Sequence, residues 1–422
     1  MLVMRTQQTI VKQTDTYYQM LDDFCFKAKN LYNCAVYHFR QALFGKEERT
    51  NYNQLDKQLK VENEGIDYRS VPLAWSAQWV IKQAENNFKA FYAACKSYAQ
   101  APEKFLGRPR PPQYLDKVNG RQMLQLNCKT IKDGNLQFPK TFNGFTIELP
   151  SYVKNIQVVR IVPKNRHIVI EVIYRVEIAD KQADNGLYAG IDIGLDNLAT
   201  VVSNTGNVPL LINGKGLKSL NQFWNKQQAH YKSVNDAMNG DWYTVKAGKT
   251  KRAERSERED TITNKRNNRV KTFMHQASRK IVDTISGWCC NTIIIGHNKN
   301  WKQESSIGRV NNQKFVQIPF NQLISMIVYK AEELGIQVIL TEESYTSKAS
   351  ALHRDFLPTY SKDITQAHTF SGKRASRGLY KSDKGVVNAD VNAAFNIMRK
   401  VVRDDLIQRI EGYSNPVSVA IH

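Results

Sequence analysis

The sequence predicts a multidomain α+β protein, and three stretches of apolar patterning predict it. Apolar residues recur at helical spacing through 16–98 and alternate at a period of two through 121–178. From residue 188 onward, short apolar strands alternate with longer helical stretches. A chain of 422 residues is long enough for two or three domains. We therefore expect a first half of strands and helices, followed by an α/β second half.

The first half is expected to be a small antiparallel β-barrel with helices inserted into it. Residues 1–13 predict a strand, and further strands are expected within 121–178. Between them, 16–43 and 73–98 carry apolar residues at the spacing of two long helices. Aromatic residues on the second helix could stack on bases, but their spacing favours a packed core. The prolines of 106–113 break helical structure.

The second half opens with three predicted strands, at 188–193, 198–203 and 209–212. A meander that starts on an apolar strand ending in an aspartate is the opening of an RNase H-like fold. Mostly helical sequence follows at 218–285. The remaining expected elements are a strand at 292–295, a helix at 319–334, a strand at 337–341 and a last helix starting near 388.

The charge of the chain indicates a polyanionic partner. Lys and Arg number 60 against 39 Asp and Glu, which gives a net charge of +21. Phosphate contacts by Lys and Arg release counterions, so nucleic acid is the expected partner. A membrane surface is the other polyanion, but the sequence has no run of 18 apolar residues. We therefore expect no membrane association.

The six cysteines indicate neither a disulfide framework nor a zinc site. They are scattered, and none forms a C-x-x-C pair. The N-terminal residues lack the apolar core of a signal peptide. A reducing, cytoplasmic setting is the expectation.

Three separated acidic residues form the candidate active site. Asp192 ends the first strand of the second half, Glu343 follows the strand at 337–341, and Asp390 starts the last helix. Taken singly, Glu343 is compatible with a solvated strand end and Asp390 with a helix N-cap. Taken together, they are typical of carboxylates that hold two divalent cations about 3.5–4 Å apart, which clamp both oxygens of a phosphodiester displacement. Strand alternation puts Glu342 and Glu343 on opposite faces, so one of them can join the site.

These residues lie in motifs that resemble the TnpB family, the transposon-encoded RNA-guided nucleases related to type V CRISPR effectors. The resemblance covers most of 107–400. Its motifs are Gly190–Leu195, Trp301–Gln303, Asn311–Pro319, Glu343–Lys348, Arg377–Tyr380 and Asn388–Asn392.

The resemblance implies a particular domain order. The expected parts are a wedge β-barrel at 1–15 and 105–180, a helical recognition region at 16–104, a RuvC nuclease domain of RNase H type at 181–348 and 388–401, a target-strand-binding insert at 349–387 and a tail at 402–422. It also implies Asp192, Glu343 and Asp390 as catalytic residues that hold two Mg²⁺ ions, for which Mn²⁺ can substitute.

Two departures from the common TnpB pattern matter. The usual catalytic glutamate would stand at Gly296, which cannot bind metal. A subset of the family, and the eukaryotic Fanzor proteins, resemble this chain in taking the glutamate from the neighbouring strand, which implies Glu343. The second departure is that the insert lacks the family's zinc cysteines, so it must be held by packing. The side chains expected to hold it are Phe356, Leu357, Phe370, Leu379 and Tyr380.

The implied function is RNA-guided DNA cleavage. A noncoding guide RNA and double-stranded target DNA are the expected partners, with one protein per guide RNA, a short DNA motif beside the target, and a prokaryotic, nucleoid-associated location. Arg377 is expected to neutralise phosphate charge near the site. The other nucleic-acid-binding candidates are Arg374, Lys373, Arg108, Arg110, Lys302, Lys348, Arg269 and Lys271. The alternatives are a nuclease-dead RNA-guided repressor, a type V-like CRISPR effector, and a resolvase or transposase without guide RNA.

Overall fold

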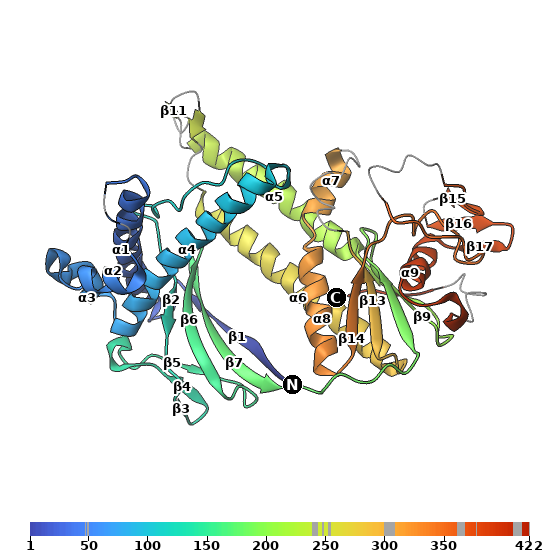
Figure 1. Cartoon of the computed structure of the whole chain (residues 1–422), viewed down its shortest axis with the longest axis horizontal. Coiled ribbons are helices and arrows are strands. Elements are labelled where there is room, and N and C mark those ends of the chain that lie inside the picture. The colour runs from blue at the N-terminus through green and yellow to red at the C-terminus, as the bar shows by residue number, and fades with distance from the viewer. Residues whose placement is uncertain are drawn as a thin grey trace. The chain divides into compact units, whose positions relative to one another are not determined.

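The computed structural model divides the chain into two compact units. It describes residues 1–46, 48, 50–238, 244–246, 249–251, 255–298, 309–360, 368–376, 378–407 and 416–421. One unit is Leu2–Glu177, and the other consists of Met1 and residues 178–422. Figure 1 shows the elements of each unit. The finer division into five segments stays a prediction. Across the described residues, no helix combines the length and hydropathy needed to cross a bilayer.

The first unit combines two antiparallel sheets with two long helices and two short ones. Strands β1 and β7 pair along their whole length, with Leu2 opposite Glu177 and Lys12 opposite His167. The helices are α1 (Tyr18–Leu43), α2 (Tyr52–Leu59), α3 (Ile66–Ser70) and α4 (Ala74–Gln100). The strands are β1 (Leu2–Lys12), β2 (Leu124–Leu126), β3 (Ile131–Lys132), β4 (Asn135–Gln137), β5 (Thr146–Glu148), β6 (Ile156–Lys164) and β7 (His167–Glu177).

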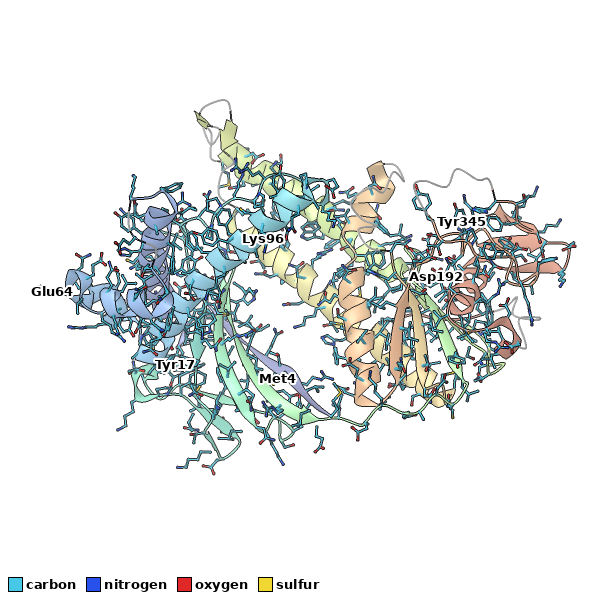
Figure 2. The ribbon with its side chains drawn as sticks, in the orientation of Figure 1. Met4, Tyr17, Glu64, Lys96, Asp192 and Tyr345 are labelled. Carbon is cyan, nitrogen blue, oxygen red and sulfur yellow. The ribbon has the colours of Figure 1, made fainter. Side chains whose placement is uncertain are left out.

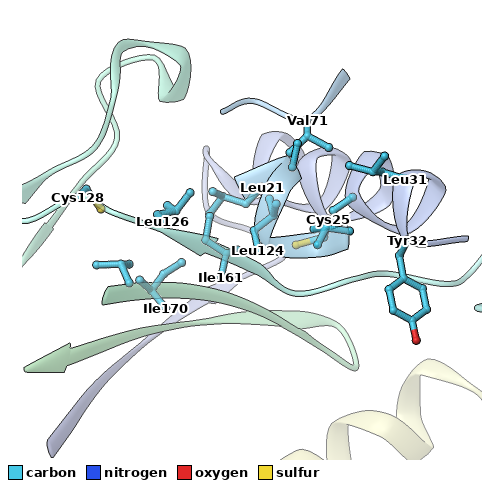
Figure 3. Close-up of a cluster of buried hydrophobic side chains, with 14 of the residues drawn as sticks. Leu21, Cys25, Leu31, Tyr32, Val71, Leu124, Leu126, Cys128, Ile161 and Ile170 are labelled. Carbon is cyan, nitrogen blue, oxygen red and sulfur yellow. The ribbon is translucent and has the colours of Figure 1, made fainter. Parts of the chain in front are cut away.

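The expected barrel does not close in the described part of this unit. One sheet has the order β1-β7-β6-β2 and ends at β1 and β2, while β3, β4 and β5 form a separate sheet. The expected barrel needs the strand at 146–148 to join the sheet that contains 156–174. This strand is β5, and it pairs with β4 in the separate sheet. One hydrophobic core joins the long helices to these sheets. In Figure 3, Leu21 and Cys25 of α1 face Leu124 and Ile161.

The second unit is built on a six-stranded mixed sheet with the order β14-β13-β8-β9-β10-β18. β13 is parallel to both β8 and β14, and β8, β9 and β10 form the expected antiparallel meander. The strands are β8 (Tyr188–Asp192), β9 (Asn197–Ser203), β10 (Leu210–Asn213), β13 (Thr292–Gly296), β14 (Gln337–Thr341) and β18 (Val417–Val419). A separate pair is formed by β11 (Thr244–Lys246) and β12 (Lys249–Lys251).

Helices cover both faces of this sheet. Alternate residues of β13 point to opposite faces: Ile293 and Ile295 pack with α6 and α8, whereas Ile294 packs with α9. The helices are α5 (Lys215–Met238), α6 (Glu257–Gly287), α7 (Arg309–Val316), α8 (Phe320–Glu333) and α9 (Ala389–Arg399). Gly190 permits the close approach of α9 to β8, because an added Cβ would lie 2.6 Å from the carbonyl oxygen of Ala394.

A small antiparallel sheet precedes α9 and was not expected from the polar sequence of 349–387. It consists of β15 (Gly372–Ser376), β16 (Leu379–Ser382) and β17 (Gly385–Asn388). Tyr380 is buried there, packs with Val387 and Ala389, and donates a hydrogen bond to the carbonyl of Lys348. Phe356 and Leu379, expected to pack inside this segment, are instead exposed. The aromatic ring of Tyr380 therefore does most of the packing.

Candidate active site

The topology brings the three predicted carboxylates to one edge of the six-stranded sheet. β8, β13 and β14 are adjacent and parallel, so their carboxyl ends meet at the same edge. Asp192 is the last residue of β8, and Glu343 follows the end of β14 by two residues. Figure 2 labels Asp192 and Tyr345, which lie toward the same end of this sheet in the view drawn. The packing of α9 on β8 adds Asp390 to them.

Asp390 is free to take part in a site because another residue caps its helix. The side chain of Asn388 accepts hydrogen bonds from the backbone N–H groups of Asp390 and Val391, at 2.9 Å and 3.2 Å. Asn388 is therefore the N-cap. The carboxylate of Asp390 instead accepts hydrogen bonds from Asn197 at 2.7 Å and from Arg374 at 3.2 Å.

The three carboxylates share a strongly negative environment. Burial raises the pKa of Asp192 to about 8, and the charges of Asp390 and Glu343 raise it further, against the lowering effect of Arg374. Burial, followed by the charge of Glu342, raises the pKa of Glu343 to about 7. Burial is the larger cause of both raised pKa values, and the charges of neighbouring carboxylates add to it. A divalent cation bound here would favour the charged forms of these carboxylates.

Glu343 is held in place by a reciprocal pair of hydrogen bonds with Asn298. The Asn298 side-chain amide donates to Oε1 of Glu343 at 3.0 Å, and the backbone N–H of Glu343 donates to Asn298 Oδ1 at 3.1 Å. Glu342 points elsewhere: its carboxylate pairs with Lys400 and accepts from the backbone N–H of Ser344. The side chains of Glu342 and Glu343 therefore contact different residues, as expected for neighbours on opposite faces.

Gly296 provides the space that the Glu343 carboxylate uses. The two residues come from adjacent strand ends, since Gly296 pairs with Thr341 across β13 and β14. A Cβ added at Gly296 would lie 3.1 Å from Oε2 of Glu343 and 2.6 Å from Cδ1 of Ile397. A side chain at 296 would thus displace the Glu343 carboxylate. Because residue 296 has no side chain, the Glu343 carboxylate has room at this position.

A cleft of about 910 Å³ opens beside Asp390. Its lining carries charges of both signs, with Arg374 and Lys215 beside Asp196 and Asp390. Its lining residues are Gly194, Leu195, Asp196, Asn197, Lys215, Arg374, Ser376, Gly378 and Asp390.

The donor set suits Mg²⁺, which prefers carboxylate oxygens. Within the described residues, however, no group of three His, Cys, Asp or Glu side chains is placed to hold a metal ion. Both oxygens of Asp390 accept hydrogen bonds, one from Asn197 and one from Arg374. Asp192 interacts electrostatically with both other carboxylates.

The other candidate residues are distributed over both units. Arg374 and Lys373 lie on β15, Lys348 follows Glu343 by five residues, and Arg269 and Lys271 are exposed on α6. Arg108 and Arg110 belong to the other compact unit. Arg377 and Lys302 lie outside the described residues.

Two asparagines at the site were not identified from the sequence. Asn298 could have been found, because it follows Gly296 by two residues and extended backbone would place both on one face. Asn197 begins β9, and no sequence signal distinguished it from a turn residue.

The fold and the site define an α+β protein with acidic residues converging at the carboxyl edge of a mixed sheet. Residues 169–302 match the family described as a probable transposase, OrfB_IS605, and residues 320–397 match the Cas12f1-like TNB domain. Both matches, together with the TnpB-like relative described next, support a place for this chain in the TnpB family.

Two relatives illustrate the similarity. The chain is 26% identical over 276 residues to the TnpB-like protein ORF457 of Acidianus two-tailed virus, covering 64% of this chain and 53% of that protein. It thus spans about half the length of this curated relative. The chain also resembles a solved Cas12f1–sgRNA–target DNA complex, with 14% identity, a TM-score of 0.50, and coverage of 90% of this chain and 82% of the other. This second likeness concerns the fold.

Proposed function

We propose that this protein is an RNA-guided DNA endonuclease of a transposable element, and that its second unit contains a RuvC-type nuclease domain. The observation that carries the proposal is the placement of the Glu343 carboxylate over Gly296, beside Asp192 and Asp390 at one sheet edge. This placement would supply a third carboxylate beside Asp192 and Asp390, because the usual position of the family's catalytic glutamate is Gly296 in this chain.

Asp192, Glu343 and Asp390 would hold two Mg²⁺ ions, or Mn²⁺ in their place. When bound, these ions supply an activated water and stabilise the leaving oxygen of the phosphodiester. The protein's own groups do the positioning: Asn298 orients Glu343 and Asn197 orients Asp390. Arg374, which pairs with Asp390 at 3.2 Å, would offset the charge of a phosphate bound beside it. Zinc has no role in this proposal.

Nucleic acid partners follow from the charge and the family. The net charge of +21 supports binding to a polyanion. The fold resembles that of Cas12f1 in a complex with sgRNA and target DNA. We therefore assign a noncoding guide RNA and double-stranded target DNA as partners, with one protein per guide RNA. Base pairing reads the target, and the protein reads a short adjacent motif. A cytoplasmic, nucleoid-associated location in a prokaryote fits these partners.

Plasmid cleavage tests this function. The protein is co-expressed with its flanking noncoding RNA and compared with Glu343→Gln and Glu342→Gln in Mg²⁺ and in EDTA. Glu343→Gln is expected to lower the cleavage rate by on the order of 10³-fold or more, because it removes a metal ligand. Glu342→Gln is the matched control, since the Glu342 carboxylate contacts Lys400 and Ser344, whereas that of Glu343 contacts Asn298. Equal cleavage by wild type and Glu343→Gln would refute the assignment.

A nuclease-dead, RNA-guided DNA-binding protein is the second candidate function. It is favoured by the ion pair between Arg374 and Asp390 and by the absence of a ready three-ligand group in the described residues. The same experiment separates the two functions. Guide-dependent DNA binding with no cleavage by wild type in Mg²⁺ or Mn²⁺ would establish the binding protein.

A further inference from the structure

A small pocket lies between α5 and α6, away from the carboxylates. The two helices pack against each other, as Figure 1 shows. Each contributes residues at positions i, i+3, i+4 and i+7, which lie along one helix face. The pocket has a volume of about 230 Å³ and is lined by Leu220, Phe223, Trp224, Gln227, Ile262, Lys265, Arg266 and Arg269. It is smaller than the ~300–1,000 Å³ typical of sites for drug-sized ligands, so one planar ring is a suitable occupant.

The aromatic residues of this pocket differ in what they do. Trp224 is half-buried and donates a hydrogen bond from Nε1 to Thr263, so it is part of the helix–helix contact. Phe223 is 60% exposed although it is one of the most hydrophobic side chains on α5. Removing the Phe223 ring from water would be favourable, but the ring remains exposed in this chain. An exposed ring beside an apolar pocket is the arrangement on which an unpaired base stacks.

The charged residues of the pocket are all basic. Lys265 and Arg269 are exposed on α6, one helical turn apart. Arg266 is fixed: it donates to Asn221 at 2.8 Å and to the carbonyl of Gln317 at 2.7 Å, and lies 5.3 Å from the Trp224 ring. These partners are neutral, so the guanidinium keeps its full positive charge at the pocket. Anionic phosphates on either side of a base would meet this charge.

We propose that the α5–α6 pocket binds an unpaired nucleobase of a single-stranded nucleic acid. Phe223 stacks on the base, while Lys265 and Arg269 contact the adjoining phosphates. The inference rests on the proposed function in taking nucleic acid as the ligand, and it adds a site separate from the cleavage centre. An apolar peptide would not need the three cations, and duplex DNA presents no free base to the ring.

Binding of oligonucleotides to the full chain tests this site. An Asp192→Ala background prevents degradation, so the result does not depend on whether the protein cleaves DNA. Affinities for oligouridine, oligothymidine and duplex DNA are measured by fluorescence anisotropy for Phe223→Leu and Phe223→Tyr in this background. Phe223→Leu is expected to weaken single-strand binding by about 5- to 100-fold, because it keeps an apolar side chain without a ring. Phe223→Tyr keeps the ring and is expected to bind like the parent.

The salt dependence of binding tests the phosphate contacts separately. Lys265→Gln is expected to reduce the slope of log K against log salt for single strands by about 0.7, the value for one phosphate contact. Lys181→Gln, which removes the same charge from an exposed position outside the α5–α6 pair, is the control. Loss for oligouridine alone would place the guide RNA in the pocket, and loss for oligothymidine alone would place a DNA strand there. Unchanged single-strand binding by Phe223→Leu would overturn the proposal, as would an equal loss for duplex DNA.

Discussion

At the scale of single residues, the site depends on pairs whose members constrain each other. Glu343 has room for its carboxylate because residue 296 has no side chain, and Asn298 fixes that carboxylate from the same strand. Asp390 likewise depends on Asn388, which takes over the capping of α9. The three carboxylates could be proposed from the sequence because they are found together at two predicted strand ends and one helix start. Asn298 could have been found from its position two residues after Gly296, whereas no sequence signal marked Asn197, whose role depends on which elements become neighbours.

Gly296→Ala tests the packing between positions 296 and 343. The added methyl group would lie 3.1 Å from Glu343 Oε2 and 2.6 Å from Ile397 Cδ1, so the carboxylate must give by a few tenths of an ångström. We expect the cleavage rate to fall, by less than the about 10²-fold that a misplacement of about 1 Å costs. Single-turnover cleavage measures it. Gly287→Ala is the control, because a Cβ there meets no atom within 4 Å. Cleavage by Gly296→Ala at the rate of the control would contradict the packing argument.

Asn298→Ala tests the orientation of Glu343. Loss of the side chain removes one hydrogen bond to the carboxylate and one from the Glu343 backbone. Losing a hydrogen bond that orients a metal ligand costs about 10- to 100-fold in metal affinity or activity. We expect the Mg²⁺ concentration for half-maximal cleavage to rise within that range, with an unchanged melting temperature in EDTA. A lower melting temperature with a normal Mg²⁺ dependence would make Asn298 a purely structural residue.

At the scale of elements, the sequence predicted β8, β9, β10, β13, β14 and α8 within a few residues, because each has a clear apolar period. It did not predict β18 or α7, and the helical stretch expected at 218–285 is divided into α5 and α6 with the pair β11–β12 between them. The small sheet β15-β16-β17 was missed because its strands are short and polar, and only Tyr380 and Val387 are buried hydrophobic residues in it. The closed barrel was wrong because a period of two predicts a strand and does not say which strand it pairs with. Pairing is decided by tertiary packing.

The contact between α6 and α8 predicts a particular pH dependence of stability. Burial lowers the pKa of Lys330 to about 8 from its ordinary 10.5, while its ammonium donates to His275 O and Ser278 Oγ. The unfolded state therefore binds more protons between these values, so the free energy of unfolding rises with pH across that window. The slope is at most about 1.4 kcal/mol per pH unit for one proton.

Lys330→Met is the variant that isolates this effect. Denaturant titrations at several pH values between 8 and 10.5 are expected to give a smaller rise for the variant than for wild type. The rise of the free energy of unfolding with pH in the variant is subtracted from that in wild type. Other titrating groups contribute equally to both proteins, so their effect cancels. Parallel curves for the two proteins would show that Lys330 is charged throughout the folded state.

At the scale of the whole molecule, the chain contains separate hydrophobic cores. One core lies entirely within Leu2–Glu177, and the buried clusters around the six-stranded sheet lie entirely within the second unit. The length of the chain and the change of apolar patterning between 121–178 and the residues from 188 onward predicted this two-part organisation.

Separate cores predict two unfolding transitions in calorimetry. Mg²⁺ is expected to raise the temperature of one transition only, because all three carboxylates belong to the second unit. Asp192→Ala should abolish this shift and leave the other transition unchanged. A single transition that shifts as a whole with Mg²⁺ would contradict independent unfolding of the two units.

The contact between Gly296 and the Glu343 carboxylate also has an evolutionary consequence. A chain with glutamate at both positions would force two like charges into one partly buried space, and a chain with glutamate at neither would lack a ligand. We therefore expect active homologues to carry glutamate at one of these two positions and a small residue at the other.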